Sequence, residues 1–239
     1  MQVNVLFTMK IITFFSVKGG TGKTTFNIML ASYLAYELNK RVLYLDLDAP
    51  EYNSYGIRQR ELATGSGCST LYPLEKVDDC SVESMRKLAK KLSDLNGMVD
   101  YVVMDFAGSL DRNDPIIQMA LAKVLDIVVI PTESESQALS SAKSLSTMFN
   151  SMNQCNLIFF NKVQSRDSAE MYNALAEWFK SKNVRVSDHR IKQTDLMRRD
   201  SEGDRRFIRS SICFPSKDIQ KVNPAIIELF NEIIMDNGN

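Results

Sequence analysis

A glycine-rich loop between a strand-like run and a helical segment constrains the fold of this chain more than any other feature. The loop reads Lys18-Gly19-Gly20-Thr21-Gly22-Lys23-Thr24-Thr25, and it follows the β-branched and aromatic run 10–17. Glycines allow backbone N–H groups to surround a polyphosphate, and the N-terminus of the following helix attracts its negative charge. We therefore predict a phosphate-binding loop in which Lys23 reaches the β- and γ-phosphates and the Thr24 hydroxyl ligates Mg²⁺.

Short apolar runs alternate with longer amphipathic segments along the rest of the chain. This order predicts an α/β fold with a doubly wound, mainly parallel sheet and helices on both faces, as in P-loop NTPases. We see no internal repeat and no linker, so residues 9–239 are expected to form a single P-loop ATPase domain, with 1–8 as an N-terminal extension. The expected strands are 10–17, 41–47, 101–106, 127–130 and 157–160, and the expected helices are 25–40, 81–96, 115–123, 134–150, 167–181 and 224–236.

Composition excludes several classes of function. The chain has 29 basic and 29 acidic residues, and this balance excludes a uniformly basic nucleic-acid coat while leaving room for a local basic patch. Four scattered cysteines and a single histidine, His189, do not have the spacing of a zinc site. No apolar run approaches the ~18 residues that span a bilayer, and the N-terminus lacks the pattern of a signal peptide. We therefore expect a cytoplasmic protein without membrane insertion.

Aspartates follow two of the expected strands. Asp46 and Asp48 close the run 41–47, and Asp105 closes the hydrophobic run 101–106 in the manner of a Walker B strand. Carboxylates at the C-terminal edge of a parallel sheet face the crevice where ligands bind. Asp105 is therefore expected to hold a Mg²⁺-bound water.

The phosphate loop departs from the standard pattern at its front. Val17 stands where the standard pattern has glycine, and Lys18 adds a second lysine, which gives the "deviant" Walker A motif. In this motif the chain resembles the ParA/MinD/Soj family of ATPases over roughly residues 10–165. The resemblance implies that loop residues 18–25 bind ATP with Mg²⁺, and that Lys18 reaches across an ATP-sandwich dimer toward the partner's phosphates. That role has the physics of an arginine finger.

The same resemblance implies roles for three further residues. Asp46 would sit in the outer shell of Mg²⁺, so that the expected metal-site residues are Thr24, Asp46 and Asp105, and Asp48 would orient the attacking water. Asn161 would contact the adenine base, and the alternative is an asparagine that serves only the turn. The chain has Ala49-Pro50 where the family commonly has Pro-Gln, and it has Phe106-Ala107-Gly108-Ser109 where Thr-Pro-Pro is usual, so switch-loop contacts do not carry over.

The resemblance favours a ParA-like ATPase. Such a protein binds MgATP, dimerises on it and hydrolyses it slowly to partition or position a plasmid, a chromosome region or a conjugative element. A ParB-like or other ATPase-stimulating protein is then the expected partner. The stretch Arg185 to Arg209 carries eight basic residues against five acidic ones, and it is interpreted either as a non-specific DNA-binding patch, with nucleoid association, or as a solvated surface loop.

Two other functions stay open. The first is a MinD-like ATPase that positions a protein or membrane complex. The final helix argues against membrane binding because its charges, Glu228, Glu232 and Asp236, are acidic, so we expect its apolar face to pack onto the domain. The second is a metabolic ligase or kinase similar to dethiobiotin synthetase.

Overall fold

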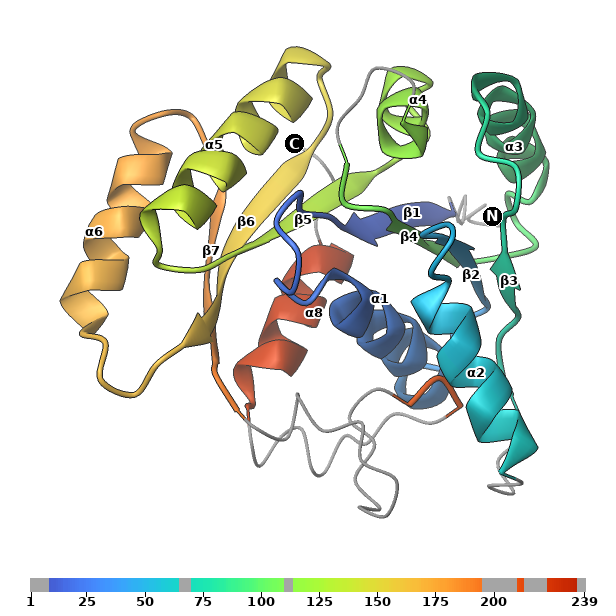
Figure 1. Cartoon of the computed structure of the whole chain (residues 1–239), viewed down its shortest axis with the longest axis horizontal. Coiled ribbons are helices and arrows are strands. Elements are labelled where there is room, and N and C mark those ends of the chain that lie inside the picture. Colours follow the sequence, from blue (N-terminus) through green and yellow to red (C-terminus); the bar gives the residue numbers. More distant parts are fainter. Residues whose placement is uncertain (1–8, 65–69, 110–113, 195–209, 213–222, 236–239) are drawn as a thin grey trace, which may run out of the picture.

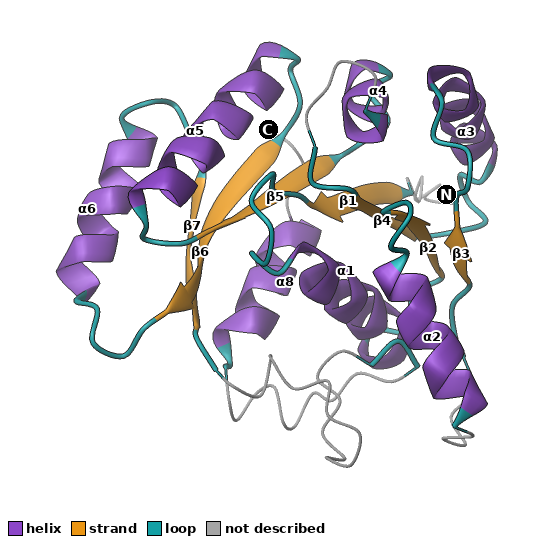
Figure 2. Ribbon diagram, viewed as in Figure 1, coloured by secondary structure: helices purple, strands orange, loops and turns teal. Residues whose placement is uncertain are grey.

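A seven-stranded sheet forms the centre of the molecule, and all of its strand pairings are parallel (Figures 1 and 2). The structure is a computed structural model that describes residues 9–64, 70–109, 114–194, 210–212 and 223–235. The strand order is β3-β2-β4-β1-β5-β6-β7, which confirms the doubly wound parallel fold. The strands are β1 Lys10–Phe14, β2 Val42–Leu47, β3 Leu74–Lys76, β4 Tyr101–Phe106, β5 Ile127–Thr132, β6 Asn156–Val163 and β7 Val186–Lys192.

Helices cover both faces of this sheet. In Figure 1, α1, α2 and α8 lie on one face, and α3, α4, α5 and α6 lie on the other. Each face has its own apolar core, which explains why the central strands are hydrophobic at nearly every position. The helices are α1 Lys23–Ser32, continued by the π-helical turn η1 Tyr33–Glu37, α2 Asn53–Ala63, α3 Val82–Asp94, α4 Pro115–Leu121, α5 Ser136–Ser151, α6 Ala169–Lys180 and α8 Ala225–Met235.

Aromatic rings pack α1 against β1, which leads into the phosphate loop, and against β6. The Phe14 and Phe26 rings stack with centroids 5.3 Å apart, and Phe159 contacts both rings edge-on at 6.0 and 5.0 Å. All three side chains are fully buried. Because aromatic pairs contribute to stability beyond their buried area, this cluster helps to hold α1 against the sheet next to the loop.

The final helix packs onto the domain, as its apolar face predicts. Ile226, Leu229, Phe230 and Ile233 are buried in the same core as α1. Glu232 of the same helix accepts a hydrogen bond from Ser187 of β7. None of the helices in the described part of the chain combines the length and the hydropathy that a membrane span requires.

The structure contains three elements that were not predicted from the sequence: α2, β3 and β7. The helix α2 lacks an apolar stripe because its buried face is largely polar, with Ser54, Arg58 and Glu61 beside Ile57. The strand β3 has only three residues. The interpretation of 185–209 as a surface loop is wrong for Val186–Lys192, which form the edge strand β7. The alternation of buried and exposed side chains along β7 is hard to recognise in the sequence, because several residues on its exposed side are charged.

Candidate functional site

The phosphate loop connects β1 to α1 at the carboxyl edge of the sheet. Gly20 and Gly22 have φ values of 74° and 103°, a left-handed backbone that favours glycine. A methyl group at Gly22 would also lie 3.1 Å from Nδ2 of Asn161 and 3.2 Å from the Phe26 ring. Helix α1 begins at Lys23, directly after these glycines. The loop therefore has the strand–loop–helix setting that phosphate binding requires.

A second loop approaches Lys23 from the end of β4. A methyl group at Gly108 would lie 2.9 Å from Nζ of Lys23 and 3.0 Å from the carbonyl oxygen of Ser16. Asp48 lies close enough to this lysine for the two charges to interact. Burial raises the pKa of Asp48, and the positive charge of Lys23 opposes that rise. The structure thus places Asp48 and the backbone of Gly108 near Lys23, and the role of these groups around a γ-phosphate stays a prediction.

The two buried carboxylates of the site lie side by side. Asp46 of β2 and Asp105 of β4 are register partners, and both side chains are fully buried. Asp46 accepts backbone hydrogen bonds from Asp48 at 3.1 Å and from Tyr55 at 2.9 Å. Burial nevertheless raises its pKa. Asp46 therefore orders the loop that carries Asp48 and the start of α2.

Asp105 is held by hydrogen-bond donors from three elements. Its Oδ1 accepts from Asn27 of α1 at 2.9 Å, and its Oδ2 accepts from Ser54 of α2 at 2.9 Å and from Tyr44 of β2 at 3.2 Å. Burial, followed by the charge of Asp46, raises the pKa of Asp105 to about 6. Sequence reasoning missed Asn27 and Ser54. The signal for Asn27 was a lone amide in an otherwise apolar helix segment.

The donor set at this edge fits Mg²⁺. Among the described residues, no group of three or more histidine, cysteine or acidic side chains could hold a metal alone. Mg²⁺ bound with nucleotides needs fewer protein ligands, because phosphate and water oxygens complete its octahedron. Thr24, at the start of α1, hydrogen-bonds to Asp105, which puts a hydroxyl and a carboxylate together. A divalent cation here would also favour the ionised form of Asp105 beside Asp46.

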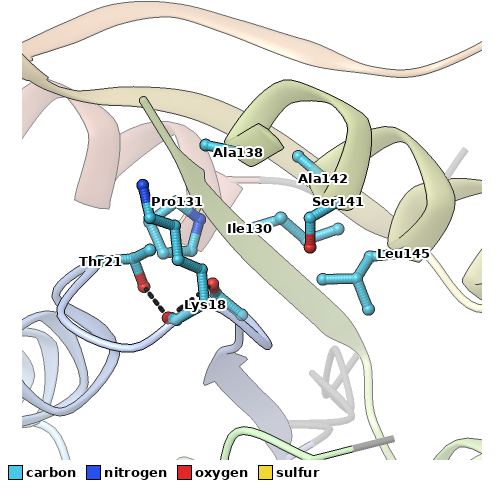
Figure 3. A pocket seen from close by; sticks show the side chains of 9 residues that line it. Lys18, Thr21, Ile130, Pro131, Ala138, Ser141, Ala142 and Leu145 are labelled. Carbon is cyan, nitrogen blue, oxygen red and sulfur yellow. Dashed lines mark hydrogen bonds between the residues drawn. The ribbon is translucent and has the colours of Figure 1, made fainter. Parts of the chain in front are cut away.

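The front lysine of the loop lies beside β5 and α5. The Lys18 side chain extends past Pro131 and Thr21, next to a pocket whose lining is too closely packed to admit water (Figure 3). The Thr21 hydroxyl donates to the Lys18 carbonyl oxygen at 3.3 Å and closes the loop on itself. Nζ of Lys18 lies 2.7 Å from a carboxylate oxygen of Glu135.

Asn161 lies within β6 and is buried, so the turn interpretation of this residue is wrong. Its Nδ2 donates a 2.7 Å hydrogen bond to the carbonyl oxygen of Thr21. The amide nitrogen thus supports the phosphate loop from the neighbouring strand. Contact with an adenine base stays a prediction.

The basic stretch is described only as far as Thr194. In this part Arg190 faces α6, where it donates to the carbonyl oxygen of Ala169 at 3.2 Å and lies 5.5 Å from the Tyr172 ring centre. Five of the eight basic residues lie outside the described residues: Arg198, Arg199, Arg205, Arg206 and Arg209.

The fold and the loop together define a P-loop nucleotide-binding protein. A parallel, doubly wound sheet carries a glycine loop before α1, and a buried carboxylate ends the neighbouring strand β4. The family described as the CobQ/CobB/MinD/ParA nucleotide binding domain matches residues 12–206. The chain belongs to this family.

Individual relatives agree with this assignment. A virulence plasmid ParA family protein of Chlamydia psittaci is 33% identical over 125 residues, which cover 49% of this chain and 45% of that protein. The match thus spans less than half the length of this relative. A putative plasmid partition protein from Borrelia burgdorferi bound to AMPPNP has a TM-score of 0.62 at 23% identity, with 94% and 99% of the two chains covered. A chain of the MinC:MinD cell division protein complex of Aquifex aeolicus has a TM-score of 0.66 at 18% identity, with 95% of this chain and 97% of that chain covered. These two structures share the fold.

Proposed function

We propose that this chain is a ParA-type ATPase that binds MgATP, forms an ATP-sandwich dimer and hydrolyses ATP slowly to partition or position DNA. One observation carries the proposal: a phosphate loop with two lysines lies at the sheet edge where Asp48 and Asp105 converge. The Chlamydia and Borrelia relatives, a virulence plasmid ParA family protein and a putative plasmid partition protein, support the DNA cargo.

Each residue has a distinct part in the proposed reaction. The backbone of 18–22 and the Lys23 ammonium bind and orient the phosphates, so that negative charge developing on the γ-phosphoryl group meets fixed positive charge. Thr24 and Asp105 would hold Mg²⁺, directly or through water, and the ion would neutralise phosphate charge. Asp48, half-buried next to Lys23, orients the attacking water. Lys18 supplies further positive charge to the partner's phosphates.

The proposed DNA contact belongs to the stretch 185–209 in the dimer. Non-specific DNA binding rests on several lysine or arginine contacts with phosphates, so that two patches in one dimer bind far more tightly than one. The packing of α8 into the domain core leaves its apolar face covered, which makes a MinD-like membrane role the weaker candidate.

Replacement of Lys23 tests the site. Lys23→Ala is expected to lower ATP affinity at least 100-fold by calorimetry, because the phosphates lose their principal cation. Asp48→Ala is expected to bind ATP and remain dimeric, with hydrolysis lost. Lys91→Ala, on the exposed face of α3, is the matched control and should behave as wild type. Unchanged ATP affinity in Lys23→Ala would refute the assignment.

DNA binding is tested separately by salt titration with ATP or ADP. We expect binding to duplex DNA of random sequence only with ATP, with an affinity that falls steeply as salt rises. Equal binding in both nucleotide states, or none, would instead favour a MinD-like function.

A further inference from the structure

Four charged side chains form a cluster beside the phosphate loop, at the carboxyl ends of β5 and β6. Nζ of Lys18 lies 2.7 Å from Oε2 of Glu135 and 3.9 Å from Oε2 of Glu133. Nζ of Lys162 lies 2.8 Å from Oε1 of Glu133. Glu133 is therefore shared between two lysines and lies closer to Lys162. Glu135 is the principal anionic partner of Lys18.

The Lys18–Glu135 contact is a charge-assisted hydrogen bond. The Lys18 ammonium holds the pKa of Glu135 below its usual range, and the hydrogen bond to Glu135 raises the pKa of Lys18. Glu135 immediately precedes α5, where the positive end of the helix dipole also favours its ionised form. Both groups are therefore charged around neutral pH, and the contact is one between two ions.

We propose that Glu135 is a positioning residue that holds Lys18 in cis in the monomer and competes with the partner's phosphates for its ammonium. This inference rests on the proposed sandwich dimer, in which Lys18 acts in trans. A lysine side chain that points to α5 of its own protomer must turn away before it can reach across the interface. The Glu135 carboxylate thus affects the equilibrium between monomer and dimer. It does not affect how the monomer binds its own nucleotide.

The size of the effect follows from the exposure of the pair. The Lys18 and Glu135 side chains are 31% and 66% exposed, and exposed ion pairs typically change an equilibrium constant by about 1.4- to fivefold. Two such contacts break for each dimer that forms. The dissociation constant of the dimer should therefore fall by about 2- to 25-fold when Glu135 loses its charge.

The experiment measures dimerisation with Mg²⁺ and AMPPNP by sedimentation velocity over a range of protein concentrations. Glu135→Gln is expected to tighten the dimer about 2- to 25-fold, and Glu135→Asp is expected to retain part of the wild-type behaviour. Calorimetric AMPPNP affinity at concentrations where the protein is monomeric should not change. In a Lys18→Ala background, Glu135→Gln should have no further effect, because the two residues act as a pair.

The control is Glu177→Gln, which removes a comparable exposed ion pair with Lys180 on α6 and should leave dimerisation unchanged. A Glu135→Gln dimer of equal or weaker affinity would overturn the inference.

Lys18 can also be followed in the nucleotide-free monomer by NMR of carbon-13-methylated lysines, assigned with Lys18→Arg. Glu135→Gln should lower the pKa of Lys18 there, and an unchanged pKa overturns the cis contact. Two results together would refute the proposed function and still establish the contact. They are a wild type that does not dimerise with AMPPNP and a pKa of Lys18 that falls in Glu135→Gln.

Discussion

Nδ2 of Asn27 donates a 2.9 Å hydrogen bond to Oδ1 of Asp105. The same amide pairs with the backbone of Phe14, where Oδ1 accepts from N–H at 2.8 Å and Nδ2 donates to the carbonyl oxygen at 3.2 Å. One fully buried side chain on α1 therefore joins the end of β1 to the carboxylate of β4. The phosphate loop begins just after Phe14, so this bond fixes the loop relative to the proposed metal site.

Asn27→Ala should destabilise the protein by about 2–4 kcal/mol, because it leaves buried polar groups of Phe14 and Asp105 without their partner. Urea unfolding of the nucleotide-free protein measures the effect. Gln137→Ala on the exposed face of α5 is the control and should stay within about 0.5 kcal/mol of wild type. Similar midpoints for Asn27→Ala and wild type would contradict the role of this bond.

Ser54→Ala tests the link between α2 and the carboxylate site. Its hydroxyl donates to Asp105 from a fully buried position, so its loss should cost about 1–2 kcal/mol of stability. Ser144→Ala removes an exposed hydroxyl that donates to the Ser140 carbonyl oxygen at 3.0 Å, and it should cost little. The two variants are compared by thermal and urea unfolding. Equal stabilities would show that the bond to Asp105 contributes nothing.

Stability of the metal-free protein should carry a pH dependence from Asp105. Its pKa is about 6 in the folded protein against 3.8 for the ordinary group, so the folded state binds the proton more tightly. Stability from this residue is therefore complete below pH 3.8 and is lost as pH rises to about 6, by at most about 3 kcal/mol.

Urea unfolding with EDTA across pH 4 to 7 measures this dependence. Other acids titrate in the same range, so the comparison is with Asp105→Asn, whose neutral side chain cannot lose a proton. The difference in free energy of unfolding between wild type and Asp105→Asn should change with pH in the direction stated above. A constant difference across the range would contradict the raised pKa.

Gly108→Ala should weaken nucleotide binding. The added methyl group would lie 3.0 Å from the backbone oxygen of Ser16 and 2.9 Å from Nζ of Lys23, so the loop after β4 or the lysine must move. We expect at least a tenfold loss of AMPPNP affinity by calorimetry. Gly56→Ala is the control: its methyl group meets no atom within 4 Å, and in α2 it should add about 0.5–1 kcal/mol of stability. Unchanged affinity in Gly108→Ala would show that the loop adapts freely.

The parts of the fold that could be predicted are those with apolar patterns. The strand 101–106 and the helix beginning at Pro115 match the structure because a buried strand and a Pro-initiated helix have strong local signals. Helix α2 could not be predicted, since its buried face consists of groups that are stable inside only through distant partners. Arg58 donates to the Ser211 carbonyl oxygen at 2.7 Å, and Glu61 accepts from the Ser211 backbone N–H at 2.9 Å. Such pairs, some 150 positions apart, leave no local periodicity.

The sequence by itself determined the α/β class, the phosphate loop at 18–25 and the identity of the carboxylates, because those depend on local residue type and on strand-to-helix order. Only the tertiary structure decided which residues support them. Asn27, Ser54 and Glu135 reach Asp105 or Lys18 across 51 to 117 positions of chain. The parallel sheet brings the ends of β1, β4 and β5 to one edge, and side chains from helices on both faces then complete the site.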